Sequence, residues 1–420
     1  MAHLEADNLR IAMLSVHSSP MGELGTKDTG GMSVYIRELA RELGNRGHLV
    51  DIYTRVNGSR QKQIAHLYEN VRLVHLRAGN NGQVNKLALY GHLDEFFREL
   101  ERFRIRESID YDLVHSHYWL SGRVGNWAQE RWEVPHVFMF HTISAVKNTT
   151  AGSEREPELR TATEKHLARN CDRLLVATDN ERGHLIRYYG ASPETIGVVP
   201  CGVNLDLFSP WDRGKARKKL GFAQDEPIVL FVGRFAPLKG IDRLMEAVCY
   251  LQHHQRLRLV VVGGDGSDTP EFQNLKELAR DFRIQDGVIF VGRIAQDKLP
   301  AYYSAADVLV VPSYYESFGL VALEALASGT PVVATKVGAM ESILREGKTG
   351  HVVSNGSPRL LAKGIEKFIS GPNGLSAHEM RASVLRFSWA SVASAMIDQY
   401  AAVRKEWGFN RCCCGKVSIL

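Results

Sequence analysis

Residues 308–327 have the sequence VLVVPSYYESFGLVALEALA, in which an apolar run, a turn-rich loop and a second apolar run follow one another. The run Val308–Val311 predicts a buried strand that ends at Pro312. A helix is predicted to follow over Phe318–Ala327, with Gly319 at its start. A strand that leads through a loop into a helix is one unit of a parallel α/β sheet, so this stretch predicts the fold class.

The same alternation extends outward from this stretch in both directions. Around it, a second half of the chain has strand patterns at Ile228–Val232, Arg258–Val262, Val288–Val291 and Pro331–Ala334, and helical patterns at Asp242–Leu251, Glu271–Phe282 and Gln296–Ser304. The first half has a helical pattern over Gly31–Arg46 and strand patterns at Arg10–Ser15, Leu49–Tyr53, Val71–Leu76, Leu113–Ser116, His136–Phe140, Arg173–Ala177 and Ile196–Val199. The turn-rich segment Pro200–Arg213 is the predicted linker between two doubly wound domains. Open α/β sheets bind ligands at the carboxyl ends of their strands, so the active site is expected in an inter-domain cleft.

Composition supports a globular protein and excludes several function classes. The 420 residues are 44% hydrophobic and 24% charged, and the net charge is +5. That charge suits anionic small molecules and is too small to indicate a nucleic-acid partner. The chain starts without the pattern of a signal peptide and has no run of about 18 apolar residues, so a cytoplasmic protein without a membrane span is expected.

The six cysteines favour no structural zinc site, because no CxxC pair is present. Cys171, Cys201 and Cys249 are single, as in reduced cytoplasmic proteins. Cys412–Cys414 could bind a soft metal or carry a lipid, but an exposed tail is the favoured interpretation.

Two cations lie in the loop after a predicted strand, in the segment FVGRFAPLKG at 231–240. Arg234 and Lys239 would sit at the mouth of a sheet, close to the start of the next helix. Such a placement suits a diphosphate. A solvated loop with two surface cations is the alternative.

Two carboxylates flank the helix start in the opening segment. Glu316 lies in the loop, and Glu324 lies eight residues later on the helix. They could accept hydrogen bonds from sugar hydroxyls, or they could be solvated surface residues. Because Glu324 lies inside an apolar run, it would need a polar partner if it were buried.

Glycines and histidines mark the first half of the chain. Gly30 and Gly31 follow the first strand and would let the backbone approach a ligand closely, although a purely conformational role is also open. The segment is not GxGxxG, which disfavours a dinucleotide site. His115, His117 and His141 follow or end predicted strands; hydrogen bonding to a polyhydroxylated ligand is favoured over zinc, and His115 is interpreted as a core residue.

The motifs GGMSVY, HSHYWLSG, HT, GRFAPLKG and ESFGLVALEA, in this order, resemble those of the retaining GT-B glycosyltransferases of family 4. The resemblance covers Arg10 to about Arg404. It is strongest for the inositol 3-phosphate glycosyltransferases that begin mycothiol synthesis, and the sucrose-phosphate synthases are near relatives. The fold implied is a pair of facing Rossmann-like domains with parallel sheets.

The resemblance implies the domain limits and the partners. Residues 1–203 would form the acceptor-binding domain, 204–385 the nucleotide-sugar-binding domain, and 386–420 a helix that packs back toward the first domain, followed by a tail. The partners would be small molecules: a UDP-sugar as donor, with no cofactor or metal required, and a phosphorylated acceptor. A homodimer is the assembly common among relatives.

The resemblance also implies donor-side roles. Arg234 and Lys239 would hold the diphosphate and stabilise the departing UDP, Glu316 would bind donor-sugar hydroxyls, and Glu324 would bind the ribose. Gly31 would offer its backbone amide near the reaction centre, and His141 would position the donor sugar. Catalysis would proceed with retention and rest on His141, Arg234, Lys239 and Glu316.

On the acceptor side, the resemblance implies a phosphate grip made by Lys86, Tyr118, Thr142 and Arg160. One position departs from the inositol enzymes, where Asn follows GGM and this chain has Ser33. A hydroxyl cannot make the two-ended contact of an amide with the acceptor ring. The phosphate grip is thus retained, while the identity of the polyol is open. From the overall resemblance, N-acetylglucosaminyl transfer from UDP-GlcNAc to 1D-myo-inositol 3-phosphate is the first expectation. Glucosyl transfer to fructose 6-phosphate and a non-catalytic sugar-nucleotide-binding protein are the alternatives.

Overall fold

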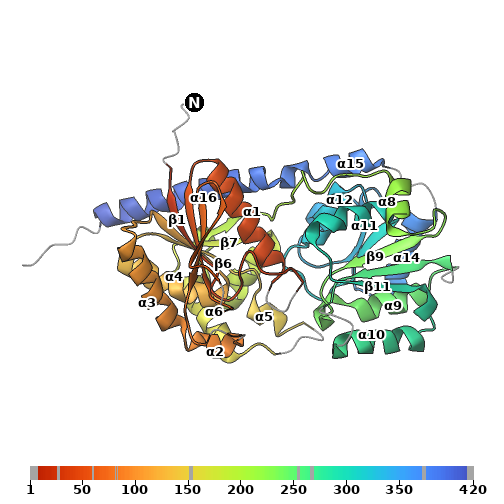
Figure 1. Ribbon diagram of the computed structural model, residues 1–420, viewed down its shortest axis with the longest axis horizontal. Helices are drawn as coiled ribbons and strands as arrows, with labels where there is room; N and C mark the ends of the chain where they lie inside the picture. Colours follow the sequence, from red (N-terminus) through yellow and green to blue (C-terminus); the bar gives the residue numbers. More distant parts are fainter. Residues whose placement is uncertain are drawn as a thin grey trace, which may run out of the picture.

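The structure is a computed structural model that describes residues 8–25, 29–58, 61–80, 82, 84–150, 155–252, 256–264, 269–370 and 375–413, with side chains described up to 408. Figure 1 shows two α/β lobes side by side, the first half of the chain in one and the second half in the other. Each lobe is built around one sheet. The predicted class, two Rossmann-like domains with parallel sheets, is confirmed.

The first sheet has eight strands in the order β3-β4-β2-β1-β5-β6-β7-β8. Their bounds are β1 Arg10–Leu14, β2 Leu49–Arg55, β3 Ile64–Tyr68, β4 Val71–Leu76, β5 Leu113–His117, β6 His136–Met139, β7 Arg173–Val176 and β8 Ile196–Val198. Only β3 runs antiparallel, paired with β4 at the edge. The sequence analysis missed β3 because its side chains are exposed or half-buried, which leaves little apolar signal.

The second sheet has six parallel strands in the order β11-β10-β9-β12-β13-β14. Their bounds are β9 Ile228–Val232, β10 Arg258–Val262, β11 Val288–Gly292, β12 Val308–Val311, β13 Val332–Thr335 and β14 Gly350–Val353. The short edge strand β14, with the sequence GHVV, was not predicted either. Five of the six strands follow the predicted apolar runs to within one residue.

Helices cover the faces of both sheets. In the first lobe they are α1 Gly31–Asn45, α2 Lys86–Tyr90, α3 Leu93–Arg106, α4 Tyr118–Trp132, α5 Ser144–Lys147, α6 Glu158–Asn170 and α7 Asp179–His184, which the π-helix η1 Leu185–Tyr189 continues. In the second they are α8 Arg213–Leu220, α9 Ile241–Cys249, α10 Pro270–Asp281, α11 Leu299–Ala305, α12 Leu320–Ala327, α13 Met340–Ile343, α14 Pro358–Ile369 and α15 Ala377–Ala382. The 3-10 turns are η2 Pro193–Thr195, η3 Pro237–Lys239, η5 Gln285–Gly287, η6 Gln296–Lys298 and η7 Leu385–Phe387. The predicted helix Gln296–Ser304 is thus a 3-10 turn followed by α11.

Alternation along the strands builds a separate core on each face of the first sheet. Ile11 and Met13 of β1 belong to the cluster that contains α1, whereas Ala12 and Leu14 belong to the cluster that contains α3 and α4. This is the period-two placement that a strand buried on both faces requires. The cluster with Ile11 continues through the linker into the second lobe, where it includes Leu309 of β12.

The last helix, α16 (Trp389–Cys413), leaves the second lobe and runs along the first one (Figure 1). The Trp389 ring lies 5.4 Å from the Tyr35 ring of α1, edge to face. Arg173 at the start of β7 forms an ion pair of 2.8 Å with Glu406. The chain therefore crosses between the lobes twice, and the crossings touch where the backbone N–H of Val203 donates to the carbonyl of Phe387 at 2.8 Å.

Candidate functional site

Two residues at neighbouring strand ends of the first sheet have left-handed backbone conformations, which residues other than glycine rarely adopt. Tyr118 follows β5 and has φ of 74°, and His141 follows β6 and has φ of 58°. Such left-handed conformations cost of order 1–3 kcal/mol and persist where the surrounding structure holds them, often at functional sites. Both residues were predicted site residues.

The four residues predicted to hold an acceptor phosphate converge around Tyr118. The guanidinium carbon of Arg160 lies 4.7 Å from the centroid of the Tyr118 ring, and the Lys86 ammonium nitrogen lies 5.6 Å from it. A terminal nitrogen of Arg160 donates to the hydroxyl of Thr142 at 2.8 Å and to its carbonyl at 3.2 Å. These residues come from α2, α4, α6 and the loop after β6, so only the tertiary fold brings them together.

Arg160 is fixed by two carboxylates. Its Nε donates to Glu164 at 2.6 Å and a terminal nitrogen pairs with Glu156 at 2.9 Å, while the Arg160 side chain is only 2% exposed. Burial acts to raise the pKa of Glu156, but Arg160 and Lys147 outweigh burial and lower it. The guanidinium is thus a buried cation with a fixed position, which suits recognition of an anion.

His17 completes this cluster and was missed by the sequence analysis. It lies in the loop after β1, with its ring centroid 4.5 Å from that of Tyr118. Burial, and then Lys86, Arg160 and His141, hold the pKa of His17 well below its usual value, so the imidazole is neutral. A histidine just after a predicted strand was the available signal, the same signal that singled out His141.

His117 and His115 form a buried row behind His141. The Nδ1 of His117 lies 2.9 Å from the Nε2 of His141, and the Nδ1 of His115 lies 2.7 Å from the hydroxyl of Tyr400 on α16. Burial lowers the pKa of His115 and of His141 to about 3. His141 is therefore a neutral hydrogen-bonding group, and His115 is the core residue that was expected. Within the described part of the chain, no group of His, Cys, Asp or Glu is arranged to hold a metal ion.

Ser33 and Gly31 lie at the start of α1 and face different surroundings. Ser33 is fully buried, and its Oγ lies 2.8 Å from the Oγ of Ser18. The Ser33 hydroxyl is thus hydrogen-bonded inside the protein. To contact an acceptor ring, it would have to break its hydrogen bond with Ser18. Gly31 is exposed, and a Cβ on it would lie 3.3 Å from a methyl of Leu320 at the start of α12.

On the second sheet, the predicted donor residues gather at the ends of two paired strands. Lys239 in η3, after β9, forms an ion pair of 2.5 Å with Glu316 in the loop after β12. Ser313 donates to the same carboxylate at 2.9 Å. Gly240 has φ of 68°, and a Cβ there would lie 2.2 Å from the carbonyl of Pro312, so the close approach of these two loops requires glycine. Arg234 is exposed in the same loop as Lys239.

Glu324 lies away from Glu316, on the buried helix α12. The hydroxyl of Tyr303 donates to one carboxylate oxygen at 2.7 Å, and the amide of Gln296 donates to the other at 3.4 Å. Burial raises the pKa of Glu324 to about 7, and the two hydrogen bonds oppose that rise. The expectation that a buried Glu324 needs a polar partner is confirmed.

The two halves touch through loops that follow β6 and β12. The hydroxyl of Ser317 donates to the carbonyl of His141, and the backbone N–H of Ile143 donates to the hydroxyl of Tyr315 at 3.2 Å. The sequence analysis did not identify Ser317 or Tyr315 as junction residues. These bonds bring His141 beside the loop that carries Glu316.

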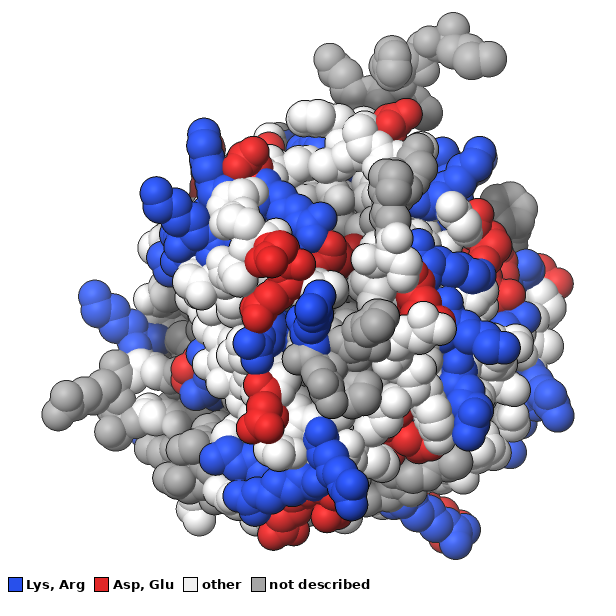
Figure 2. Space-filling model, turned by 90° about the vertical axis from the view of Figure 1, so that its right-hand side faces the viewer, with Lys and Arg blue, Asp and Glu red and all other residues white. Residues whose placement is uncertain are grey.

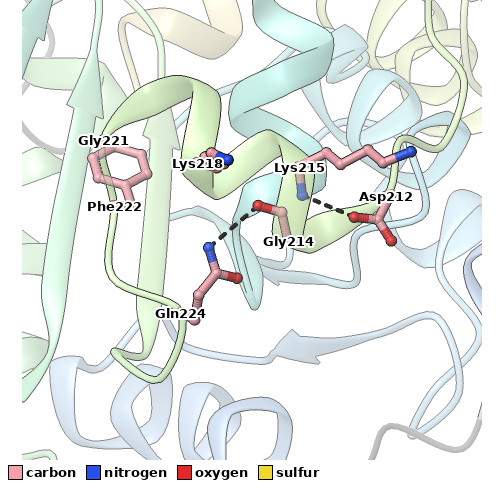
Figure 3. A pocket seen from close by; sticks show the side chains of 7 residues that line it. All are labelled: Asp212, Gly214, Lys215, Lys218, Gly221, Phe222 and Gln224. Atoms are coloured by element: carbon pink, nitrogen blue, oxygen red, sulfur yellow. Dashed lines mark hydrogen bonds between the residues drawn. The ribbon is translucent and has the colours of Figure 1, made fainter.

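A hollow of about 550 Å³ lies elsewhere, on α8 of the second lobe. Figure 3 shows its lining, with Lys215 and Lys218 of α8 and with Phe222 and Gln224 beyond its end. Figure 2 shows that lysines and arginines are interspersed with acidic residues over that end of the molecule. None of the predicted site residues lines this hollow.

Comparison with known protein families covers both lobes. The profile described as Glycosyltransferase Family 4 matches residues 29–207, and the one described as Glycosyl transferases group 1 matches residues 212–384.

No helix among the described residues is long and apolar enough to cross a membrane. The side chains of Cys412–Cys414 lie outside the described residues.

Individual relatives match nearly the full length. The chain is 41% identical over 403 residues to D-inositol 3-phosphate glycosyltransferase 2 of Catenulispora acidiphila, covering 93% of this chain and 94% of that protein. It is 41% identical over 410 residues to the D-inositol 3-phosphate glycosyltransferase of Streptomyces scabiei, covering 94% and 92%. The solved sucrose-phosphate synthase of Thermosynechococcus elongatus is 32% identical, with a TM-score of 0.87 over 95% of this chain and 100% of that one.

Proposed function

The chain belongs to family 4 of the retaining glycosyltransferases, and we propose that it moves a hexosyl group from a UDP-sugar to a phosphorylated polyol or sugar. In its specific form the reaction is N-acetylglucosaminyl transfer from UDP-GlcNAc to 1D-myo-inositol 3-phosphate. The convergence of Lys86, Tyr118, Thr142 and Arg160 carries this proposal. Lys86 and Arg160, two cations beside one aromatic ring, supply N–H donors that the phosphate of an acceptor can accept from.

On the donor side, Lys239 and Arg234 bind the diphosphate. The Lys239 ammonium has three donors, so it can keep Glu316 and still bind a phosphate oxygen. Glu316 then remains beside the diphosphate and accepts from hydroxyls of the donor sugar. Glu324 accepts from the ribose, because each of its oxygens is bonded once and keeps further acceptor capacity.

Catalysis in this proposal rests on positioning and on charge. The acceptor, gripped through its phosphate, presents a hydroxyl to the anomeric carbon, and His141 orients the donor sugar as a neutral hydrogen-bonding group. Lys239 and Arg234 stabilise the negative charge that grows on the leaving UDP. Attack from the face that the UDP leaves accounts for retention of configuration. The loops joined through Ser317 and His141 limit the access of water to the reaction centre.

Glucosyl transfer to fructose 6-phosphate is the second candidate. One observation favours it: the solved sucrose-phosphate synthase aligns with a TM-score of 0.87. The departure at Ser33 that the resemblance to the inositol enzymes implies is compatible with it. The phosphate grip around Arg160 serves either acceptor, so the two candidates share the same machinery.

A donor and acceptor panel separates the candidates. Purified protein is incubated with UDP-GlcNAc or UDP-glucose together with inositol 3-phosphate or fructose 6-phosphate, and products are identified by mass spectrometry. We expect the product of UDP-GlcNAc and inositol 3-phosphate to form fastest. Sucrose phosphate as the main product would select the second candidate. A rise of the melting temperature with UDP but no product from any pair would indicate a non-catalytic sugar-nucleotide-binding protein.

A further inference from the structure

A row of hydrogen bonds runs from α1 of the first lobe to Glu324 in the second. A terminal nitrogen of Arg37 donates to Oε1 of Gln296 at 2.7 Å. Nε2 of Gln296 donates to Oε1 of Glu324 at 3.4 Å, and the hydroxyl of Tyr303 donates to the other oxygen of Glu324 at 2.7 Å. Arg37 is separated from Gln296 by 259 residues, so this row exists only when the lobes lie together.

Arg37 decides which end of the Gln296 amide faces Glu324. A guanidinium has only donors, so it can bind the oxygen of the amide and not its NH₂ group. With the oxygen turned to Arg37, the NH₂ group points at Glu324. Without Arg37, the amide could turn over and place its oxygen against Glu324, which in its ionised form has no proton to donate.

The guanidinium of Arg37 is itself held in place. Its Nε lies 3.4 Å from Glu38, whose second oxygen pairs with Arg41 at 2.9 Å and accepts from Asn204 of the linker at 3.3 Å. Glu38 is buried, and the Arg37 side chain is 17% exposed. Arg41 thus shares the environment of Arg37 but has no contact with Gln296 among the described hydrogen bonds, which makes it a matched control.

No described contact joins the Glu324 carboxylate directly to a cation. Of the charged residues on the elements packed against α12, Arg381 of α15 donates to the carbonyls of Leu205, Phe208 and Ala327. Glu379 of α15 accepts from Ser376, and Glu341 of α13 is paired with Lys336. Gln296 is therefore the link between a positive charge and this buried carboxylate among the described contacts.

We propose that Arg37 and Gln296 are positioning residues that orient the Glu324 carboxylate for the donor ribose only when the first lobe is docked against η6. This inference rests on the proposed function, which assigns Glu324 to the ribose. Binding of the nucleotide and closure of the two lobes are then coupled: docking of α1 prepares the ribose site, and an occupied ribose site favours docking, because such linkage is reciprocal.

The test compares UDP with 2′,3′-dideoxy-UDP, which lacks the hydroxyls that Glu324 would bind. Affinities of the full-length protein are measured by calorimetry for the wild type, Arg37→Met and Arg41→Met, with melting temperatures as the check on folding. We expect Arg37→Met to weaken UDP about tenfold, the change given by about 1.4 kcal/mol, and to leave the affinity for dideoxy-UDP unchanged. We expect Arg41→Met to change neither affinity by more than about twofold. Equal losses for the two ligands, or equal effects of the two variants, would overturn the proposal.

A double-variant cycle separates this inference from the function on which it rests. In a Glu324→Gln background, Arg37→Met should cause no further loss of UDP affinity, because its target carboxylate is gone. A full tenfold further loss would show that Arg37 acts elsewhere and would overturn the relay. A wild-type protein that binds no UDP would overturn the proposed function and the relay together, whereas tight UDP binding that Arg37→Met does not weaken would overturn the relay alone.

Discussion

The proposed acceptor half and the proposed donor half of the site hold their cations in different ways. In the first lobe, Arg160 is 2% exposed and is locked between Glu156 and Glu164. In the second lobe, Lys239 is 25% exposed and has one carboxylate partner, Glu316. Arg160 is thus part of the folded core, whereas Lys239 is more exposed and can rearrange, as the proposed binding of a diphosphate requires.

The two halves of the site also differ in which residues adopt left-handed backbone conformations. In the first lobe, residues with large side chains, Tyr118 and His141, adopt left-handed conformations. In the loops of the second lobe that carry Lys239 and Glu316, the residues in that conformation are glycines, Gly240 and Gly319, which adopt it at little cost. The first lobe therefore stores strain to place its side chains, and we expect substitutions there to affect stability as well as activity.

The largest effect is expected for Arg160→Met. Removal of the guanidinium leaves Glu164 buried without its partner, and breaking a buried ion pair costs about 3–5 kcal/mol of unfolding free energy. Urea unfolding measures this loss, and Lys165→Met, an exposed change on the same helix, is the control. Arg160→Lys should keep the protein folded while raising the KM for the acceptor, because lysine lacks the forked geometry. Unchanged stability of Arg160→Met would contradict the contrast between the two halves.

A large effect on turnover alone is expected for Lys239→Ala. Loss of one charge that stabilises the leaving group should reduce kcat about 100- to 1000-fold, with no change in the melting temperature because the side chain is partly exposed. Product formation at saturating substrates gives kcat, and Lys215→Ala on α8 serves as a control for the loss of a lysine. Near-normal turnover of Lys239→Ala would remove Lys239 from the proposed mechanism.

The smallest effect per residue is expected from acidification, which changes the free energy of unfolding through the protonation of buried side chains. His115 and His141 have pKa values of about 3 in the fold against an ordinary value of 6.5, so they bind protons more readily when the chain unfolds. Their contribution to stability is complete above pH 6.5 and is lost as pH falls below it, by up to about 1.4 kcal/mol per pH unit for each residue. Glu324, with a pKa of about 7, acts in the opposite direction in the second lobe, because it is protonated in the fold below pH 7.

Hydrogen exchange at pH 7.5 and 5.5 can resolve this difference between the lobes. Amides of the first lobe should lose protection on acidification, although Glu181 and Asp172, whose pKa values burial raises to about 7 and about 6, reduce the loss. Amides around α12 should keep theirs. Equal loss of protection in both lobes would show that the histidines do not set the acid stability of the first lobe.

The sequence by itself determined the alternation of the buried strands and helices and the motifs that are proposed to bind the donor. Strands buried on both faces are near-continuous apolar runs, so β9 to β13 were predictable, while the edge strands β3 and β14 carry too little apolar signal. The pair Lys239 and Glu316 was predictable because each follows a strand, and neighbouring parallel strands end at the same edge of a sheet.

The tertiary structure alone decided which further residues complete each half of the site and which contacts join the two lobes. His17 against Tyr118, Ser317 against His141 and the row from Arg37 to Glu324 join residues that are between 101 and 287 positions apart by their numbers in the sequence. No local pattern records such pairs, since a single histidine, serine or glutamine is compatible with many surroundings. Their roles depend on how two sheets pack through one shared core and one crossing helix, and that packing is set by the whole chain at once.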